Sequence, residues 1–203
     1  MVPNGDHSAH TRGRINKRHT LVKDVTFNLV RHVRTATGGL QYGVEKEVHM
    51  ETLGFTRLNT NDGRDIADIA LMPHTGATDS IVVDIAVVHP SMRDPRDWTS
   101  GAKAEREAID KWKKYSVWNV PAADVVPLVL DTYGGINKAG LEFINRISAT
   151  IASGDQDRLK ELRKTFRESL AIARVRGQGA LIESWNRQNR YCSGGVGGPF
   201  MSI

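Results

Sequence analysis

One stretch restricts the fold of this chain more than any other. Residues 80–88 contain the run IVVDIAVV, which is almost entirely isoleucine and valine. A short β-branched run that is apolar at nearly every position predicts a central strand covered on both faces. Asp84 stands in the middle of this run. Because an isolated carboxylate is costly to bury, we expect Asp84 to pair with a cation or to bind a metal.

A second acidic strand precedes this run, and a charged helix follows it. Residues 66–71 form a shorter apolar segment that carries Asp68, and a glycine-containing turn leads from it to the run around Asp84. Residues 101–116 have the pattern of a helix. The residues at four-residue steps on one face of that helix are Glu107, Lys111 and Tyr115. A hairpin would bring the two aspartates together, and a helix packed over the sheet would bring Lys111 to them.

The rest of the chain predicts further helices and strands around this centre. Helices are expected at residues 20–36, from Asn137 to the SGDQ break at 153–156, and from Asp155 or Asp157 onward, and strands at residues 40–51 and 125–131. Pro127 is typical of a strand start or an edge strand. Gly177 and Gly179 are expected to interrupt the last helix. The order of elements indicates an α/β fold, in which helices flank a mixed β-sheet core and a helical extension follows.

Charge and composition divide the chain into four parts. Residues 1–18 are expected to form a basic, flexible arm, and residues 19–152 the folded core. Residues 153–191 are expected to form a basic helical extension, and residues 192–203 a flexible glycine-rich tail. The basic residues that we expect to contact a nucleic-acid backbone are Arg12, Arg14, Lys17, Arg18, Lys160, Arg163, Lys164 and Arg167. The alternative for the arm is a solvated tail.

The composition narrows the classes of function. The 203 residues carry a net charge of +5, which favours a polyanionic partner. The single cysteine, Cys192, excludes an internal disulfide and a multi-cysteine zinc site, and it is typical of a reducing compartment. No apolar stretch is long enough to cross a membrane, and the N-terminus lacks the apolar segment of a secretory signal. We therefore expect an intracellular protein, nuclear or cytoplasmic, that does not bind membranes.

The acids and the lysine match what metal-dependent cleavage of a phosphodiester needs. A divalent metal held by carboxylates neutralises the phosphate and lowers the pKa of the attacking water, and a nearby cation assists it. Asp68 and Asp84 are the expected ligands of Mg²⁺ or Mn²⁺, and Lys111 is the expected cation. Glu45 or Glu47 is a candidate third ligand. These two share one face of their strand, so strand parity does not choose between them.

Each of these residues also has a purely structural interpretation. Asp68 can cap a strand end or a turn, Asp84 can form a salt bridge, and the segment KWKKY can be an exposed helix face. Taken together, two acids on an apolar hairpin followed by a lysine favour a catalytic site or a former one. The histidines of the N-terminal arm have no cysteine nearby, so they are not expected to bind a structural metal.

The order of these motifs resembles a known family. The motifs are RHTLV, the glutamate after GLQYGV, RDIADIAL, VVDIAVVHP, the helix ending in KKY, and PLVLDTYGG. They resemble the restriction-like endonuclease domain of LINE-type retrotransposon polyproteins, which belongs to the PD-(D/E)XK nuclease superfamily. The resemblance extends over residues 18–150 and implies a restriction-endonuclease-like fold.

The resemblance also implies a set of site residues. These are Asp68 and Asp84 as the two acids, Lys111 or Lys114 as the lysine, Tyr115 at the end of the helix, and Glu45 as the upstream acid. In this family the lysine has moved from the strand to the helix. The chain departs from the superfamily pattern at Ala67, where proline is usual, and at Ala86, where the strand lysine is usual. The cysteine/histidine knuckle that often precedes the domain is also absent.

Three functions are compatible with this pattern. The first is a Mg²⁺-dependent endonuclease that nicks DNA, with RNA as the alternative substrate. The second is a catalytically inactive nucleic-acid-binding or scaffold protein on the same fold, which the departures from the superfamily pattern favour. The third is a junction-resolving nuclease, which requires a symmetric dimer. The sequence leaves open whether the chain forms a homodimer.

Overall fold

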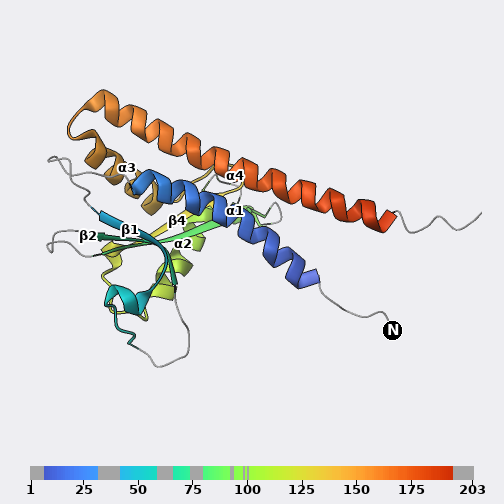
Figure 1. Cartoon of the computed structure of the whole chain (residues 1–203), viewed down its shortest axis with the longest axis horizontal. Coiled ribbons are helices and arrows are strands. Elements are labelled where there is room, and N and C mark those ends of the chain that lie inside the picture. The colour runs from blue at the N-terminus through green and yellow to red at the C-terminus, as the bar shows by residue number, and fades with distance from the viewer. Residues whose placement is uncertain are drawn as a thin grey trace, which may run out of the picture.

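Helices cover both faces of a single mixed sheet in the computed structural model (Figure 1). The structure describes residues 7–31, 42–58, 66–73, 80–91, 94–97, 99 and 101–193. The elements in chain order are α1 (His7–Val30), β1 (Tyr42–His49), η1 (Met50–Leu53), β2 (Ile66–Pro73), β3 (Ile81–Val88), η2 (Pro95–Asp97), α2 (Ala102–Tyr115), η3 (Ala122–Asp124), β4 (Val125–Asp131), α3 (Lys138–Ala152) and α4 (Gln156–Ser193). The protein is therefore an α/β protein with a long C-terminal helix, as the pattern predicts.

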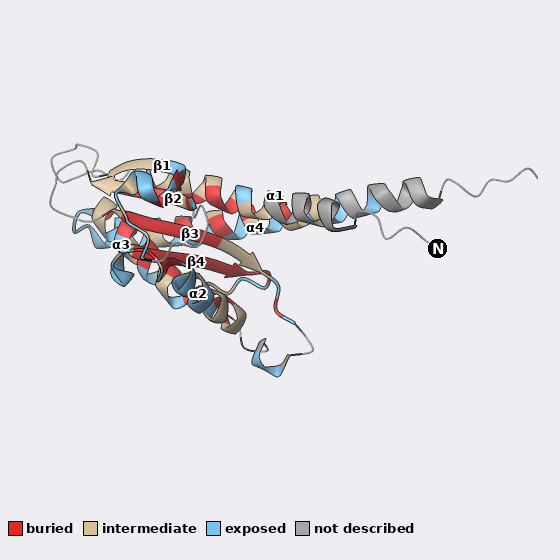
Figure 2. Cartoon of the chain, turned by 90° about the horizontal axis from the view of Figure 1, so that it is seen from below, coloured by how far each residue is buried: buried red, intermediate tan, exposed pale blue. Residues whose placement is uncertain are grey.

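The strand order in the sheet is β1-β2-β3-β4. Strand β2 runs antiparallel to both β1 and β3, and β4 runs parallel to β3. Helix α2 makes the crossover that a parallel pair requires. The interior position predicted for the strand around Asp84 is confirmed, and Figure 2 shows β3 and β4 as the most buried strands. Pro127 lies in β4, which is an edge strand. The N–H that proline lacks would face the open edge of the sheet, so no hydrogen bond between strands is lost.

The two faces of the sheet have separate cores. The larger core lies under α1, α3 and α4 and contains Val83 and Ile85 of β3. The smaller clusters lie on the other face, under α2, and contain Val82 and Trp118. Side chains alternate between the two faces along a strand. This alternation places Asp84 on the face that α2 covers.

Two expectations for the ends of the chain are corrected. The first helix begins at His7, so residues 7–18 are helical rather than an irregular arm, and it ends at Val30. Helix α1 runs beside α4 over part of its length (Figure 1), and the two helices contact each other. The expected tail keeps helical structure through Ser193. Residues 1–6, 32–41 and 194–203 lie outside the described residues.

Gly177 and Gly179 do not interrupt the last helix, because α4 continues through both positions. A Cβ atom built on Gly177 would lie 2.7 Å from Cγ and 2.8 Å from Cα of Arg18. Gly177 is thus a point of close approach between the backbones of α1 and α4, and any larger residue would push the helices apart. A Cβ atom on Gly179 would meet nothing within 4 Å. Packing, not local propensity, explains why a glycine is tolerated at position 177.

The break between α3 and α4 lies where the sequence predicts it. Ser153 has a φ of 51° and Gly154 a φ of 95°, the left-handed conformation that ends many helices. The Oδ1 atom of Asp155 then accepts the amides of Asp157 and Arg158, each at 3.0 Å, and caps α4. Within the described part of the chain, none of the helices has the length and apolar character needed to cross a membrane.

Candidate active site

The carboxylate of Asp84 is buried between β3 and α2 and is bound by two lysines. Lys111 donates a hydrogen bond to Oδ1 at 2.7 Å, and Lys114 donates one to Oδ2 at 3.3 Å. The two lysines are three residues apart and so share one face of α2. Two ammonium groups compensate for the burial of the carboxylate, as the isolated acid in an apolar run requires. Both candidates for the site lysine therefore contact the same acid.

The two lysines differ in their surroundings. The side chain of Lys111 is 16% exposed, whereas that of Lys114 is 39% exposed. The Lys114 ammonium lies 4.7 Å from the centroid of the Tyr115 ring and 3.3 Å from its hydroxyl. Tyr115 itself is buried, and its hydroxyl donates to the carbonyl of Ile66 at 3.4 Å. The tyrosine thus anchors the end of α2 to the start of β2 and leaves Lys114 facing solvent.

Asp68 lies where β2 and β3 stop pairing. The paired residues of these strands end at Ile69 and Val83. Beyond them, Oδ2 of Asp68 accepts the amide of Ile85 at 2.7 Å and contacts Nε2 of His19 at 3.0 Å. The carboxylate therefore links β2 to β3 at one end of the pairing, and it links both strands to α1.

The pKa of Asp68 is lowered from its ordinary value. Burial alone would raise the pKa of this carboxyl, but three other contacts outweigh it. They are the hydrogen bond and charge of His19, the amide of Ile85, and an interaction with the side chain of Asp84. Asp68 thus binds the residue next to Asp84, which places the two aspartates near each other, and Asp68 is ionised at neutral pH.

Of the two candidate glutamates, Glu47 is the one near Asp68. The β1–β2 register pairs the residues on either side of Glu47 with those on either side of Asp68, which places the two acids opposite each other. Lys23 of α1 binds the Glu47 carboxylate and lowers the pKa of that group, while the charge of Asp68 opposes this shift. Glu45, which the resemblance favours, is exposed and stands opposite Ala70.

The carboxylates of Asp68 and Asp84 supply some of the oxygen ligands that a hard divalent cation needs. Carboxylate oxygens are the ligands that Mg²⁺ and Mn²⁺ prefer, and the carboxylate of Asp68 binds the amide of Ile85, the residue next to Asp84. Within the described residues, no group of three or more histidine, cysteine, aspartate or glutamate side chains is placed to hold a metal. Two protein ligands with water completing the shell is a common arrangement for Mg²⁺. The metal would have to displace contacts that His19 and the lysines now make.

Sequence reasoning missed the two residues that α1 contributes. His19 contacts Asp68, and Lys23 contacts Glu47. The two residues are four positions apart, so they lie on one face of the helix. The signal that could have identified them is this four-residue spacing of a histidine and a lysine on one helix face. That spacing can be recognised only if the helix is known to start well before residue 20.

The basic residues expected to bind nucleic acid are divided between α1 and α4. Arg12 and Arg14 lie in α1, and their side chains are outside the description. Lys17 is exposed, which leaves it available to a partner. Arg18 is half-buried against Gly177, and burial lowers the pKa of its guanidinium. Arg18 therefore contributes to helix packing.

The four candidates in α4 also differ. Lys160 and Lys164 are exposed and form ion pairs with acids about one turn away, at 3.4 and 3.9 Å. Arg163 is half-buried, and its Nε has no hydrogen-bond partner among the described residues. Arg167 is exposed beside a cavity at the β4–α3 turn. Their spacing places all four on one face of α4, where they differ in exposure and in the groups that they contact.

No protein-family model and no curated protein matches the sequence. The chemistry of the site is therefore inferred from its geometry alone. That geometry is two aspartates on neighbouring strands, linked through the amide of Ile85. Basic side chains reach one of them from α1 and the other from α2. A cluster of titratable groups that contains a carboxyl with a lowered pKa is typical of functional sites.

Proposed function

We propose that the protein is a Mg²⁺- or Mn²⁺-dependent endonuclease that nicks DNA. Its fold would be restriction-endonuclease-like and related to the endonuclease domain of LINE-type retrotransposons. The observation that carries the proposal is that Asp68 binds the amide of Ile85, the residue next to Asp84, while Lys111 and Lys114 both bind Asp84. Two acids and a lysine in one place are what cleavage of a phosphodiester requires.

The two aspartates would hold the metal in this proposal. A bound divalent cation neutralises charge on the phosphate and lowers the pKa of the attacking water. A carboxylate must be ionised to act as a ligand. The lowered pKa of Asp68 supports this role, because it keeps the group charged well below neutral pH. The amide of Ile85 fixes the orientation of the carboxylate.

The two lysines would have different tasks. Lys111 makes the shorter contact and is the more enclosed, so it would neutralise Asp84 and hold it in place. Lys114 makes the longer contact and is the more exposed, so it would turn toward the scissile phosphate. Tyr115 would keep Lys114 at the mouth of the site by anchoring the end of α2.

A nicking assay on supercoiled plasmid with Mg²⁺ or Mn²⁺ tests the proposal. We expect wild-type protein to nick the plasmid and both Asp68→Asn and Asp84→Asn to lose that activity. Asp110→Asn is the matched control, because Asp110 is an exposed acid of α2 that pairs only with the neighbouring Lys113 in the contacts described. A wild-type protein that nicks no faster than Asp84→Asn would overturn the proposal.

The second candidate is a nucleic-acid-binding protein that does not cleave. It is favoured by the contacts at Asp84, where a lysine binds each carboxylate oxygen, so the acid is neutralised without a metal. This candidate predicts salt-dependent binding that survives Asp84→Ala and no nicking by any variant. Binding and nicking measured on the same preparations separate the two functions.

A further inference from the structure

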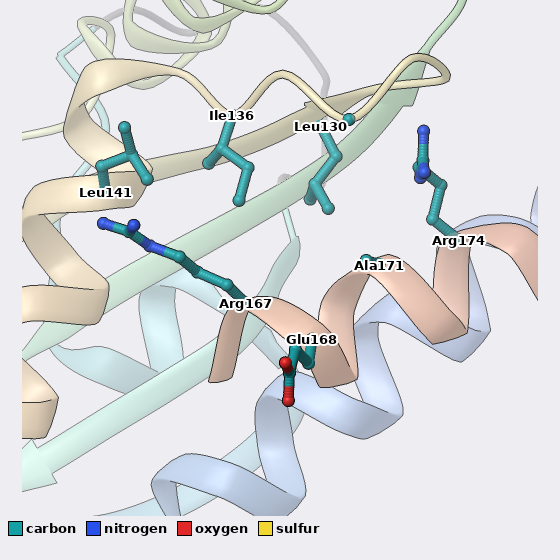
Figure 3. A pocket seen from close by; sticks show the side chains of 8 residues that line it. Leu130, Ile136, Leu141, Arg167, Glu168, Ala171 and Arg174 are labelled. Atoms are coloured by element: carbon teal, nitrogen blue, oxygen red, sulfur yellow. The ribbon is translucent and has the colours of Figure 1, made fainter. Parts of the chain in front are cut away.

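A cavity of about 430 Å³ lies between α4 and the turn that joins β4 to α3. Figure 3 shows the side chains that line it. They are Leu130, Gly134, Ile136, Leu141, Arg167, Glu168, Ala171 and Arg174. Leu130 belongs to the core under α1, α3 and α4. The cavity therefore lies on the face of the sheet opposite to Asp84 and belongs to a different site.

The lining combines an apolar wall with two cations. Leu130, Ile136 and Leu141 form the wall on the side of the sheet and α3, and Ala171 faces them from α4. Arg167 and Arg174 stand at the two ends of the cavity in Figure 3. They are seven residues apart, so they are separated by two helical turns, or about 10 Å along α4. Such a spacing suits a ligand with an apolar body and negative charge at its ends.

Arg174 is held in position by the turn. Its Nη1 donates a hydrogen bond to the carbonyl of Thr132, and its Nε has no hydrogen-bond partner among the described residues. The hydroxyl of Thr132 is in turn fixed by Nδ1 of His89, at 2.6 Å. The guanidinium is thus already ordered beside Gly134 of the cavity lining, where its two terminal nitrogens lie within 4 Å of a Cβ atom built on that glycine. A preordered donor lowers the entropic cost of binding an anion.

The same turn carries an exposed aromatic side chain. Tyr133 directly precedes Gly134 of the cavity lining and is 59% exposed. Its ring lies against the ring of His89, with 5.8 Å between the centroids. Arginines that bind phosphates, next to an exposed aromatic ring on which a base can stack, are the features by which proteins bind single-stranded nucleic acid.

We propose that this cavity binds one nucleotide of a single-stranded nucleic acid. The base would pack against the apolar wall, Arg167 and Arg174 would bind the phosphates on either side, and the next base would stack on Tyr133. An acidic peptide would match the two arginines but would leave the wall and the aromatic ring without a role. The site goes beyond the proposed nuclease activity and does not depend on it, because it requires neither a metal nor the two aspartates.

Fluorescence anisotropy with the full chain, in EDTA, tests this site. The probe is a labelled oligodeoxythymidylate of about 15 nucleotides. We expect Arg167→Ala and Ala171→Phe, which fills the cavity without changing its charge, each to weaken binding by about fivefold or more. Tyr133→Ala should weaken it similarly, and Tyr133→Phe should not. Arg176→Ala is the matched control, because Arg176 is an exposed arginine on the other edge of α4, and it should bind within about twofold of wild type.

Three results would each overturn the proposal. The first is wild-type affinity in both Arg167→Ala and Ala171→Phe. The second is an equal loss in Arg176→Ala, which would indicate a diffuse charge effect. The third is displacement of the probe by polyglutamate as effectively as by unlabelled oligonucleotide, which would indicate a general anion site. Nicking by the same variants is measured in parallel with Mg²⁺, whereas the binding assay contains EDTA, so a failure of this site is distinguished from a failure of the nuclease proposal.

Discussion

The ammonium of Lys111 lies 2.7 Å from Oδ1 of Asp84, and this contact joins the middle of the interior strand β3 to the helix that crosses from it to β4. Both groups are largely removed from solvent. Breaking a buried ion pair from one side leaves a charge without compensation, which costs more than the pair itself contributes. The pair therefore links the stability of the fold to the chemistry of the site.

Lys111→Met should destabilise the protein by about 3 kcal/mol, because Asp84 then keeps only the longer contact to Lys114. Lys114→Met should cost about 1 kcal/mol or less, since that lysine is more exposed and screened by water. Urea unfolding measures both losses. Lys113→Met, at an exposed position between them, serves as the control. Equal losses for the two site lysines would contradict this ranking.

Lys114→Ala should reduce the rate of nicking by about a hundredfold or more while leaving the protein folded, because the proposed role of Lys114 is to reach the phosphate. Lys114→Arg should restore part of the rate, since it keeps the charge at the mouth of the site. The measurement is the single-turnover nicking rate, beside a circular dichroism melting curve. A folded Lys114→Ala variant with the wild-type rate would exclude this role.

Acid should remove the stability that Asp68 provides. The pKa of this carboxyl is lowered in the folded protein, so its contribution is fully present above the unfolded-chain pKa of about 3.9 and is lost as the pH falls through the folded value. The difference in unfolding free energy between wild type and Asp68→Asn should therefore be constant between about pH 6 and pH 5 and should shrink below about pH 4. Urea unfolding across this range checks it, and a difference that stays constant to the lowest pH would contradict the direction of the shift.

Two glycines of α4 should respond oppositely to the same substitution. Gly177→Ala should destabilise the protein by about 1–3 kcal/mol, because the added methyl would meet backbone and side-chain atoms of Arg18. Gly179→Ala should stabilise it by about 0.5–1 kcal/mol, because the position is helical and open. Thermal melting of the two variants side by side measures both effects. A stabilising Gly177→Ala would mean that the two helices do not approach closely there.

The elements that the sequence predicts well are those with a strong local signal. The strand at Val125–Asp131 has the expected bounds, and the strand around Asp84 has the expected interior position. In both, a short apolar run bounded by polar or turn residues carries the information. The nearness of Asp68 to Asp84 and the reach of the lysines to Asp84 follow from such local patterns and from the hairpin that joins the two strands.

The features that escaped prediction depend on contacts between distant parts of the chain. Gly177 looks like a helix breaker until Arg18 is known to lie against it. His19 looks like one histidine of a basic arm, because its partner, Asp68, is 49 residues away. The choice between Glu45 and Glu47 needed the β1–β2 register, which the sequence of one strand does not contain.

The antiparallel packing of α1 on α4 (Figure 1) has a consequence for how the protein is made. The ribosome makes α1 before α4, and the face of α1 that carries His19 reaches its place only when α1 is docked. During translation the two acids can meet within the hairpin of β2 and β3 before α1 has its partner helix. A nascent chain that stalls before α4 would therefore lack the helix that holds α1, and with it His19, against the acids.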